Sequence, residues 1–380
     1  MHVLIVGRGI PDKQYPFMGI FEFDQAKALA EAGIDVTFFA VDLRSIRRKR
    51  KLGIHSGISN GVQWHRIDVP LGAVPHSVLL KIGTCALKKL YKKVFTDKDT
   101  KPDLIHAHFT EIAYMAAKLA EREKLRLVVT EHSSEMNKPV INEPLLSYAR
   151  YAYTKADAVI AVGQGLADNI KKNTGVTCTV IPNIMAGEDF YEVKRNPELK
   201  SFGFVFCGNL IEGKRPDILL SAFSSLQKQY PDIRLGFVGD GPLRAVLEKR
   251  TEELNLKASV QFYGRIRRNV IASVYSDYDF FVLPSRSETF GVAYIEAMAA
   301  GLPVIATKCG GPEDFVTPEV GVLIPVDDEE ALVNAMEKMI RTDKEYIRDN
   351  LKQYVQKRFS ADRIARELIY SYTMIQKKPR

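Results

Sequence analysis

The sequence of 380 residues contains little cysteine and no long apolar run. Its four cysteines lie far apart and form no CxxC pair, which excludes a disulfide framework or a zinc ribbon and fits a reducing compartment. No apolar run reaches the roughly 18 residues that span a bilayer. The first residues have no basic lead and too short an apolar core for a signal peptide. We therefore expect a cytoplasmic protein.

Extremes of composition are also absent. Hydrophobic residues make up 46% of the chain and charged residues 26%, which excludes a disordered or collagen-like protein. At about 150 residues per domain, the length predicts two or three domains. Lys and Arg number 54 against 46 Asp and Glu, so the formal net charge is +8.

The positive charge is concentrated in residues 44–101, which hold 14 Lys and Arg against 3 Asp and Glu. The segment includes a basic run at 47–51 and a predicted helix over 78–95. The predicted apolar stripe of this helix is Leu79, Ile82, Ala86, Leu90 and Val94, and lysines cover the rest. Such a helix can lie on an anionic membrane surface, or it can face the protein core with solvated lysines. Both interpretations stay open, whereas nucleic acid binding explains none of the motifs in the C-terminal half and is not expected.

Strand-like and helix-like segments alternate along most of the chain. The strand candidates are residues 1–7, 35–40, 104–105, 127–129, 158–160 and 179–181, then 204–206, 235–238, 260–262, 280–283, 304–306 and 322–324. This alternation predicts parallel sheets covered on both faces. We therefore expect an α/β protein with two doubly wound Rossmann-like domains, residues 1–185 and 200–360, joined by a polar linker. The domains should face each other across a cleft, with the ligand at the carboxyl ends of their strands.

One strand–loop–helix segment in the C-terminal half carries the most informative pattern. The loop contains Glu288, and Glu296 is the only charge on the apolar helix that follows. A carboxylate in such surroundings needs hydrogen-bond donors, which the hydroxyls of a sugar or ribose could supply. The N–H groups of Thr289, Phe290 and Gly291 at the helix start suit an anion or sugar oxygens. The alternative explains this segment equally well: Glu296 reaches solvent and Glu288 is a first-turn charge.

Glu288 and Glu296 match the E-x7-E signature of the retaining, GT-B-fold glycosyltransferases of family four (glycosyl transferases group 1), and the resemblance spans nearly the whole chain. Its other motifs are Gly19-Ile20-Phe21, Asp103-Leu104-Ile105-His106-Ala107-His108, Val129-Thr130-Glu131-His132, Pro182-Asn183, Gly239-Asp240-Gly241-Pro242, Tyr263-Gly264-Arg265 and Gly310-Gly311-Pro312-Glu313. The resemblance implies a GT-B fold and a UDP- or GDP-sugar donor, with no metal ion or cofactor. Chemistry at a membrane surface would suggest a glycan or lipid-linked acceptor, in polysaccharide or glycolipid biosynthesis. With a membrane-facing basic segment, the enzyme would be peripheral at the inner face of the membrane.

The resemblance assigns roles to residues of the C-terminal domain. Glu296 would accept hydrogen bonds from the ribose, and the backbone near Arg265 and Ile266 would read the base. Glu288 would face the transferred sugar. The N–H groups that bind the donor would be those of Thr289, Phe290 and Gly291.

Cationic side chains would neutralise the diphosphate, because the family uses no essential metal ion for this purpose. The family pattern G-R-L-x3-K-G places Lys214 on the diphosphate, but Asn209 stands where the family has an arginine. Arg215 replaces a glycine of this pattern and could supply the missing charge.

In the N-terminal domain, the resemblance concerns one glycine and two histidines. Gly19 would let its loop approach the diphosphate or the acceptor, because it has no Cβ. His132 would face the donor sugar and His108 would line the acceptor side, although a histidine at a strand end is more often structural. The last helix, about residues 361–380, would pack back on this domain. Retention by front-face attack, without a protein nucleophile, is what the family implies.

Three other interpretations fit parts of the sequence. A Rossmann dehydrogenase needs G-x-G-x-x-G after the first strand, whereas residues 7–12 lack the third glycine and contain Pro11. A nucleotide-sugar epimerase or hydrolase on the same fold would convert the donor without an acceptor. A two-domain solute-binding protein would bind free sugar. The glycosyltransferase interpretation accounts for most of the motifs and is our expectation.

Overall fold

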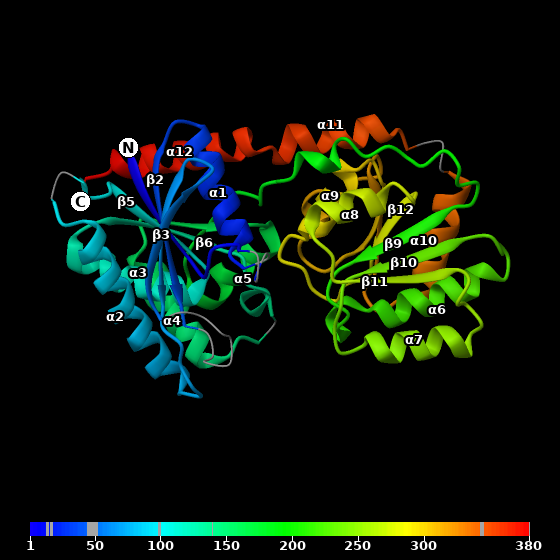
Figure 1. Ribbon diagram of the computed structural model, residues 1–380, viewed down its shortest axis with the longest axis horizontal. Helices are drawn as coiled ribbons and strands as arrows, with labels where there is room; N and C mark the ends of the chain where they lie inside the picture. Colours follow the sequence, from blue (N-terminus) through cyan, green and yellow to red (C-terminus); the bar gives the residue numbers. More distant parts are fainter. Residues whose placement is uncertain are drawn as a thin grey trace. The chain divides into compact units, whose positions relative to one another are not determined.

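The computed structural model describes residues 1–12, 15, 18–43, 52–97, 100–138, 140–342 and 346–379. The chain divides into two compact units, which we call unit 1 (Met1–Ile184 with Ala361–Arg380) and unit 2 (Met185–Ser360). Within the described ranges, each unit is built around one sheet (Figure 1). Residues 44–51, with their basic run at 47–51, and residues 98–99 lie outside the described residues. The structure therefore bears on only part of the predicted basic segment.

The sheet of unit 1 has the strand order β3-β4-β2-β1-β5-β6-β7-β8. Its strands are β1 (His2–Gly7), β2 (Asp35–Asp42), β3 (Gly53–Ser59), β4 (Val62–Asp68), β5 (Leu104–His108), β6 (Arg126–Glu131), β7 (Ala158–Ala161) and β8 (Thr179–Val180). Each pairing is parallel except that of β3 with β4. The strand order reverses at β1, between β2 and β5, and doubly wound sheets bind their ligands at such a point.

The antiparallel hairpin of β3 and β4 is absent from the predicted alternation. Asn60 and Gly61 form its turn, with φ of 50° and 75°. Two-residue hairpin turns of type I′ need positive φ at both positions, and Asn-Gly is a preferred pair. This dipeptide is therefore the sequence signal for the hairpin, in a segment whose pattern is dominated by positive charge.

Helix α2 (His76–Val94) corresponds to the helix expected over 78–95. Its buried residues are Leu80, Gly83, Thr84, Ala86, Leu87, Leu90 and Tyr91. Of the predicted apolar stripe only Ala86 and Leu90 belong to this set, so the buried face is rotated relative to the prediction. The helix packs on α3 (Thr110–Glu123) and on the sheet. Its apolar side is therefore part of the core of unit 1, while Lys81, Lys89, Lys92 and Lys93 are exposed.

The C-terminal helix α12 (Ala361–Gln376) belongs to unit 1 and packs against α1 (Ile20–Glu31). A hydrogen bond of 2.6 Å joins Tyr372 Oη to His106 Nδ1 and ties the helix to β5. The other helices of this unit are α4 (Glu143–Lys155), α5 (Gln164–Thr174) and the 3-10 helix η2 (Ser134–Asn137).

The sheet of unit 2 is parallel throughout, with the order β11-β10-β9-β12-β13-β14. Its strands are β9 (Gly203–Cys207), β10 (Arg234–Val238), β11 (Val260–Gly264), β12 (Phe280–Leu283), β13 (Val304–Thr307) and β14 (Gly321–Ile324). Its helices are α6 (Pro216–Gln227), α7 (Arg244–Glu253), α8 (Arg268–Tyr275), α9 (Val292–Ala299), α10 (Glu329–Arg341) and α11 (Arg348–Phe359), with 3-10 helices η3 (Glu188–Phe190), η4 (Glu212–Lys214) and η5 (Pro312–Asp314). Here the order reverses at β9, between β10 and β12.

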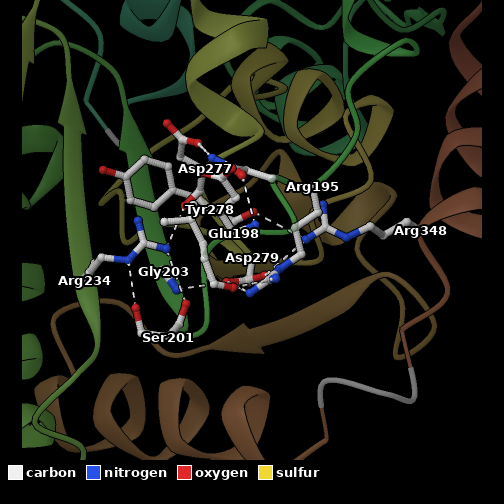
Figure 2. A network of polar contacts seen from close by, with 11 residues as sticks. Arg195, Glu198, Ser201, Gly203, Arg234, Asp277, Tyr278, Asp279 and Arg348 are labelled. Carbon is white, nitrogen blue, oxygen red and sulfur yellow. Dashed lines mark hydrogen bonds and ion pairs between the residues drawn. The ribbon is translucent and has the colours of Figure 1, made fainter.

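A buried carboxylate fastens the first residues of unit 2 to its sheet (Figure 2). Asp279, 3% exposed, accepts hydrogen bonds from Arg195 Nε at 2.5 Å and from the backbone N of Gly203 at 3.0 Å. Arg348, at the start of α11, donates to the same carboxylate at 3.3 Å. Arg195 lies in the segment expected to link the domains, so this network makes that segment part of unit 2.

Candidate functional site

The residues singled out in the sequence lie at the carboxyl ends of strands in both sheets. In unit 1, Gly19 precedes α1, His108 ends β5 and His132 follows β6. In unit 2, Lys214 ends η4, after β9, and Glu288 lies between β12 and α9. Gly19 and His108 in unit 1, and Lys214 and Glu288 in unit 2, therefore end or follow the strands where the order of each sheet reverses. His132 follows β6, the strand next to β5.

Two residues of unit 2 that were predicted separately are paired. Lys214 Nζ and Glu288 Oε1 form an ion pair at 2.5 Å. Ser285 Oγ donates a hydrogen bond to the same oxygen at 2.7 Å. Glu288 is 8% exposed, and a carboxylate removed from water needs such partners. The structure thus joins the residue predicted for the diphosphate to the one predicted for the transferred sugar.

The turn of Thr289, Phe290 and Gly291 is held by close backbone packing. Gly291 has φ of 96°, and α9 begins after it at Val292, two residues later than expected. A Cβ at Gly311 would lie 2.7 Å from the backbone N of Phe290. The Gly310-Gly311 motif therefore allows its loop to pack directly on this turn.

Glu296 pairs with a residue that has no role in the sequence analysis. Arg268 Nη2 and Glu296 Oε1 are 2.7 Å apart, with side chains 18% and 11% exposed. Arg268 is the first residue of α8, and Glu296 lies within α9. The ion pair places a cation beside Glu296, which offsets the cost of its negative charge in apolar surroundings.

The other predicted donor residues lie outside these two ion pairs. Arg215, with φ of 51°, forms ion pairs with Asp217 and Asp327. Its guanidinium is therefore engaged by other carboxylates than Glu288. Arg265 is exposed and Ile266 half-buried, directly after β11.

Three histidines form a buried stack in unit 1. The ring centroids of His106 and His108 are 4.5 Å apart, and those of His108 and His132 are 5.3 Å apart. A hydrogen bond of 3.0 Å joins His108 Nδ1 to His132 Nε2, and the side chain of Asn183 also hydrogen-bonds His132. His106 Nε2 lies 2.7 Å from Thr130 Oγ1. The two histidines with separate predicted roles are therefore direct partners.

Burial keeps this stack neutral at pH 7. It lowers the pKa of His106 and that of His132 to about 3, and it lowers the pKa of His108 well below the usual value. The positive charge of Arg8 acts in the same direction on His108 and His132, and the hydrogen bond between His132 and Asn183 raises the pKa of His132 in opposition. Neutral imidazoles can accept hydrogen bonds, so the stack offers hydrogen-bond acceptors and does not take up protons at pH 7.

Phe109 connects this stack to Arg8. Phe109 has φ of 66°, which is rare for a bulky residue and is found at constrained or functional positions. Its ring centroid is 4.9 Å from the ring of His132 and 3.3 Å from the guanidinium carbon of Arg8. Arg8 Nε donates at 3.0 Å to Glu22, which is fully buried. Arg8 was missed in the sequence because it stands inside the glycine pattern tested for dinucleotide binding.

Gly19 is required by the fold of its own loop. It has φ of 70°, and a Cβ there would lie 2.0 Å from the carbonyl oxygen of Gly9. No side chain fits this approach, whichever ligand the loop contacts.

The described residues contain neither a cluster of metal ligands nor a membrane-spanning helix. Nowhere among them do three or more His, Cys, Asp or Glu side chains gather as ligands for a metal ion. None of the helices within the described ranges is both long enough and apolar enough to cross a bilayer.

Known proteins resemble the chain over its full length. Residues 21–185 match the family "Glycosyltransferase Family 4" and residues 188–358 match "Glycosyl transferases group 1". A Bacillus subtilis (strain 168) protein named for teichuronic acid biosynthesis, the glycosyltransferase TuaC, is 27% identical over 99% of each chain. Sucrose-phosphate synthase from Thermosynechococcus elongatus superposes with a TM-score of 0.78 at 23% identity, over 98% of each chain. Anabaena HepE, solved in complex with UDP, superposes with a TM-score of 0.72 at 19% identity, over 98% of this chain and 99% of its own.

The two Rossmann-like sheets and these structural matches define the GT-B fold. The two family matches adjoin and together span most of the chain, which belongs to glycosyltransferase family 4, glycosyl transferases group 1. The predicted fold class and the predicted sugar transfer are thereby confirmed. The comparisons give no support to the epimerase or hydrolase alternative.

Proposed function

We propose that this enzyme transfers a sugar from a UDP- or GDP-sugar to a glycan or lipid-linked acceptor, with retention of configuration and without a metal ion. Unit 2 binds the donor and unit 1 binds the acceptor. The observation that carries the proposal is the pairing of both carboxylates of the E-x7-E motif with cations in unit 2. Glu288 pairs with Lys214, and Glu296 pairs with Arg268.

A nucleoside diphosphate has two features that match this arrangement. Its diphosphate is anionic, and Lys214 together with the N–H groups of Phe290 and Gly291 meets that charge. Its ribose carries two neighbouring hydroxyl donors, and Glu296 is an acceptor for them. The base lies near the backbone of Arg265 and Ile266 in this proposal. Thr289 and Glu288 face the transferred sugar.

Two relatives support the substrate classes. HepE is solved with UDP, which favours a uridine donor over others. TuaC is named for teichuronic acid biosynthesis, which favours an acceptor in polysaccharide assembly. Both are proposals for this chain, because identity to these proteins is 19% and 27%.

The chemistry in unit 1 depends on neutral histidines. His132, with His108 behind it, meets the donor sugar, and Gly19 shapes the loop beside α1. Glu288 is held by Lys214 and Ser285, which supports a binding role over that of a covalent nucleophile. Attack by the acceptor from the face of the leaving diphosphate then gives retention, and Lys214 stabilises the departing charge.

The exposed lysines of α2 support a peripheral position at an anionic membrane surface, at the inner face of the membrane. Lys81, Lys89, Lys92 and Lys93 remain available because the apolar side of this helix is inside unit 1. Each such charge near a surface of this kind contributes about 1 kcal/mol. The idea is abandoned if the protein does not sediment with anionic vesicles.

Calorimetric titration with UDP, GDP and ADP, followed by their sugars, tests the proposed function. UDP or GDP should bind, and Lys214→Ala and Glu296→Ala should each weaken that binding by about tenfold or more, equivalent to about 1.4 kcal/mol. Lys228→Ala is the matched control, because Lys228 is exposed at the end of α6. Equal affinity in the parent and in both site variants would exclude this site.

A further inference from the structure

Arg268 occupies a position between two elements of unit 2. It begins α8, and its guanidinium reaches the carboxylate of Glu296 on α9, with Nη2 2.7 Å from Oε1. It also lies beside the first segment of unit 2, since a Cβ built on Gly187 would be 3.7 Å from Arg268 Nε. The side chain is 18% exposed, so most of its surface contacts protein.

Glu296 depends on a cation in these surroundings. Its neighbours on α9, Ile295 and Ala297, are fully buried. Burial is the main cause that raises the pKa values of Cys207 and Tyr275, and the negative charge of Glu296 raises both further. Removing an ionised carboxylate from water costs several kcal/mol, and a paired guanidinium offsets much of that cost.

A guanidinium also restricts the direction of its partner. It is planar and rigid, whereas a lysine ammonium is a point charge on a flexible chain. Two neighbouring ribose hydroxyls form good hydrogen bonds only with a carboxylate held in one orientation. A carboxylate that rotates freely would lose this advantage, since ordering it on binding costs entropy.

We propose that Arg268 is a positioning residue that orients Glu296 for the ribose hydroxyls of the nucleotide. The inference rests on the proposed function, because it requires a nucleoside diphosphate in unit 2. Arg268 acts through Glu296 and does not itself take part in sugar transfer. It therefore sets the discrimination between a ribonucleotide and its deoxy form.

Calorimetry with UDP and 2′-deoxy-UDP tests this role, or with GDP and 2′-deoxy-GDP if the parent binds guanosine diphosphate more tightly. The parent should prefer the ribonucleotide by about tenfold, the worth of one well-placed hydrogen bond to a charged group. In Arg268→Met, binding of the ribonucleotide should weaken by about tenfold while binding of the deoxy form changes less than about twofold. The preference should therefore disappear.

Two further variants separate positioning from charge and from folding. Arg268→Lys keeps the charge without the planar fork, and we expect an intermediate preference. Arg267→Met removes the preceding, exposed arginine and should leave the preference as in the parent. Thermal melting of each variant shows whether it is folded, and the lysine variant keeps the test valid if the methionine variant is not.

The remaining outcomes contradict the proposal in different ways. If Arg268→Met weakens both nucleotides by the same factor, Arg268 acts on the diphosphate or on the fold. If it strengthens the ribonucleotide, Arg268 competes with the ribose for Glu296. If the parent binds the nucleotide and Arg268→Met keeps the parent's preference for the ribonucleotide, the role of Arg268 is rejected and the proposed function is not. A parent that binds no nucleoside diphosphate rejects the proposed function and this inference together.

Discussion

All seven histidines of the chain precede residue 185, and three of them form the neutral stack of unit 1. Unit 2 contains no histidine and holds its candidate residues by ion pairs, Lys214 with Glu288 and Arg268 with Glu296. The first arrangement is uncharged, stacked and hydrogen-bonded, and the second pairs opposite charges that are partly removed from water.

Because of this difference, we expect the two units to be destabilised by different changes. A buried neutral histidine is disturbed by protons, because the unfolded chain takes them up at a higher pH than the folded chain does. A buried ion pair is disturbed by removal of one partner, because the other charge is then left without compensation. The two units should therefore respond in different degrees to acid and to single charge substitutions.

The largest expected effect is the loss of unit 1 stability in mild acid. The unfolded chain protonates its histidines near pH 6.5, whereas His106 and His132 in the folded chain do so only at about pH 3. As pH falls from about 6.5 to 3, each buried histidine should therefore cost about 1.4 kcal/mol of unfolding free energy per pH unit. Hydrogen exchange of the full chain at pH 7.5, 6.5 and 5.5, corrected for intrinsic rates, measures this loss by segment.

Two histidine variants sharpen that comparison. His108→Gln removes one buried titrating group and should make the pH dependence of unit 1 less steep. His76→Gln, at an exposed position in α2, should not change it by a comparable amount. An equal loss of protection in unit 2 would show that the histidine stack is not the cause.

Much of the fold was predictable because its signals are local. Apolar strands such as β1 and β12 alternate with helices, and that alternation specifies parallel sheets. The hairpin of β3 and β4 was missed, since strand pairing depends on the turn at Asn60 and Gly61 and not on a strong strand pattern. The buried face of α2 was displaced because Leu79 and Leu80 are both apolar, and only packing on α3 decides which one is buried.

The site was predictable where a motif has a characteristic spacing, as Glu288 and Glu296 do. Their partners were harder to predict, because they come from elements distant in the chain. Arg265, Arg267 and Arg268 are close in sequence, and only the placement of α8 decides that Arg268 reaches Glu296. Asn183 was known as part of a motif, but its bond to His132 depends on how its segment lies beside β6.

A smaller effect is expected from breaking the charge network of unit 2 in Figure 2. Asp279→Asn leaves Arg195 and Arg348 without their buried carboxylate. Both cations are about one-third exposed and can be hydrated again. We therefore expect the free energy of unfolding to fall by about 3 kcal/mol, the lower end of the range for breaking a buried ion pair. Asp277→Asn is the control: its carboxylate accepts from the neutral Asn196, and the loss should stay near 1 kcal/mol.

Hydrogen exchange measures the loss of stability in each unit of the Asp279→Asn variant separately. Protection should fall in unit 2 peptides and remain in those of the histidine stack. An equal loss of protection in both units would mean that the two units unfold together. The contrast between histidines and ion pairs would then apply to the two sites and not to the stability of the two units.

The smallest effect concerns the attachment of α12 to the histidine stack. Tyr372→Phe removes the hydroxyl that bonds His106 Nδ1 at 2.6 Å, and both residues are fully buried. A buried nitrogen left without a partner costs about 1–3 kcal/mol, and in a unit of this size each kcal/mol lowers the melting temperature by about 2–4 °C. Tyr370→Phe, two residues earlier on the same helix and 68% exposed, should change it by less than about 1 °C. If both substitutions lower the melting temperature of unit 1 equally, the neutral stack does not depend on this hydrogen bond, and packing alone must hold α12 in place.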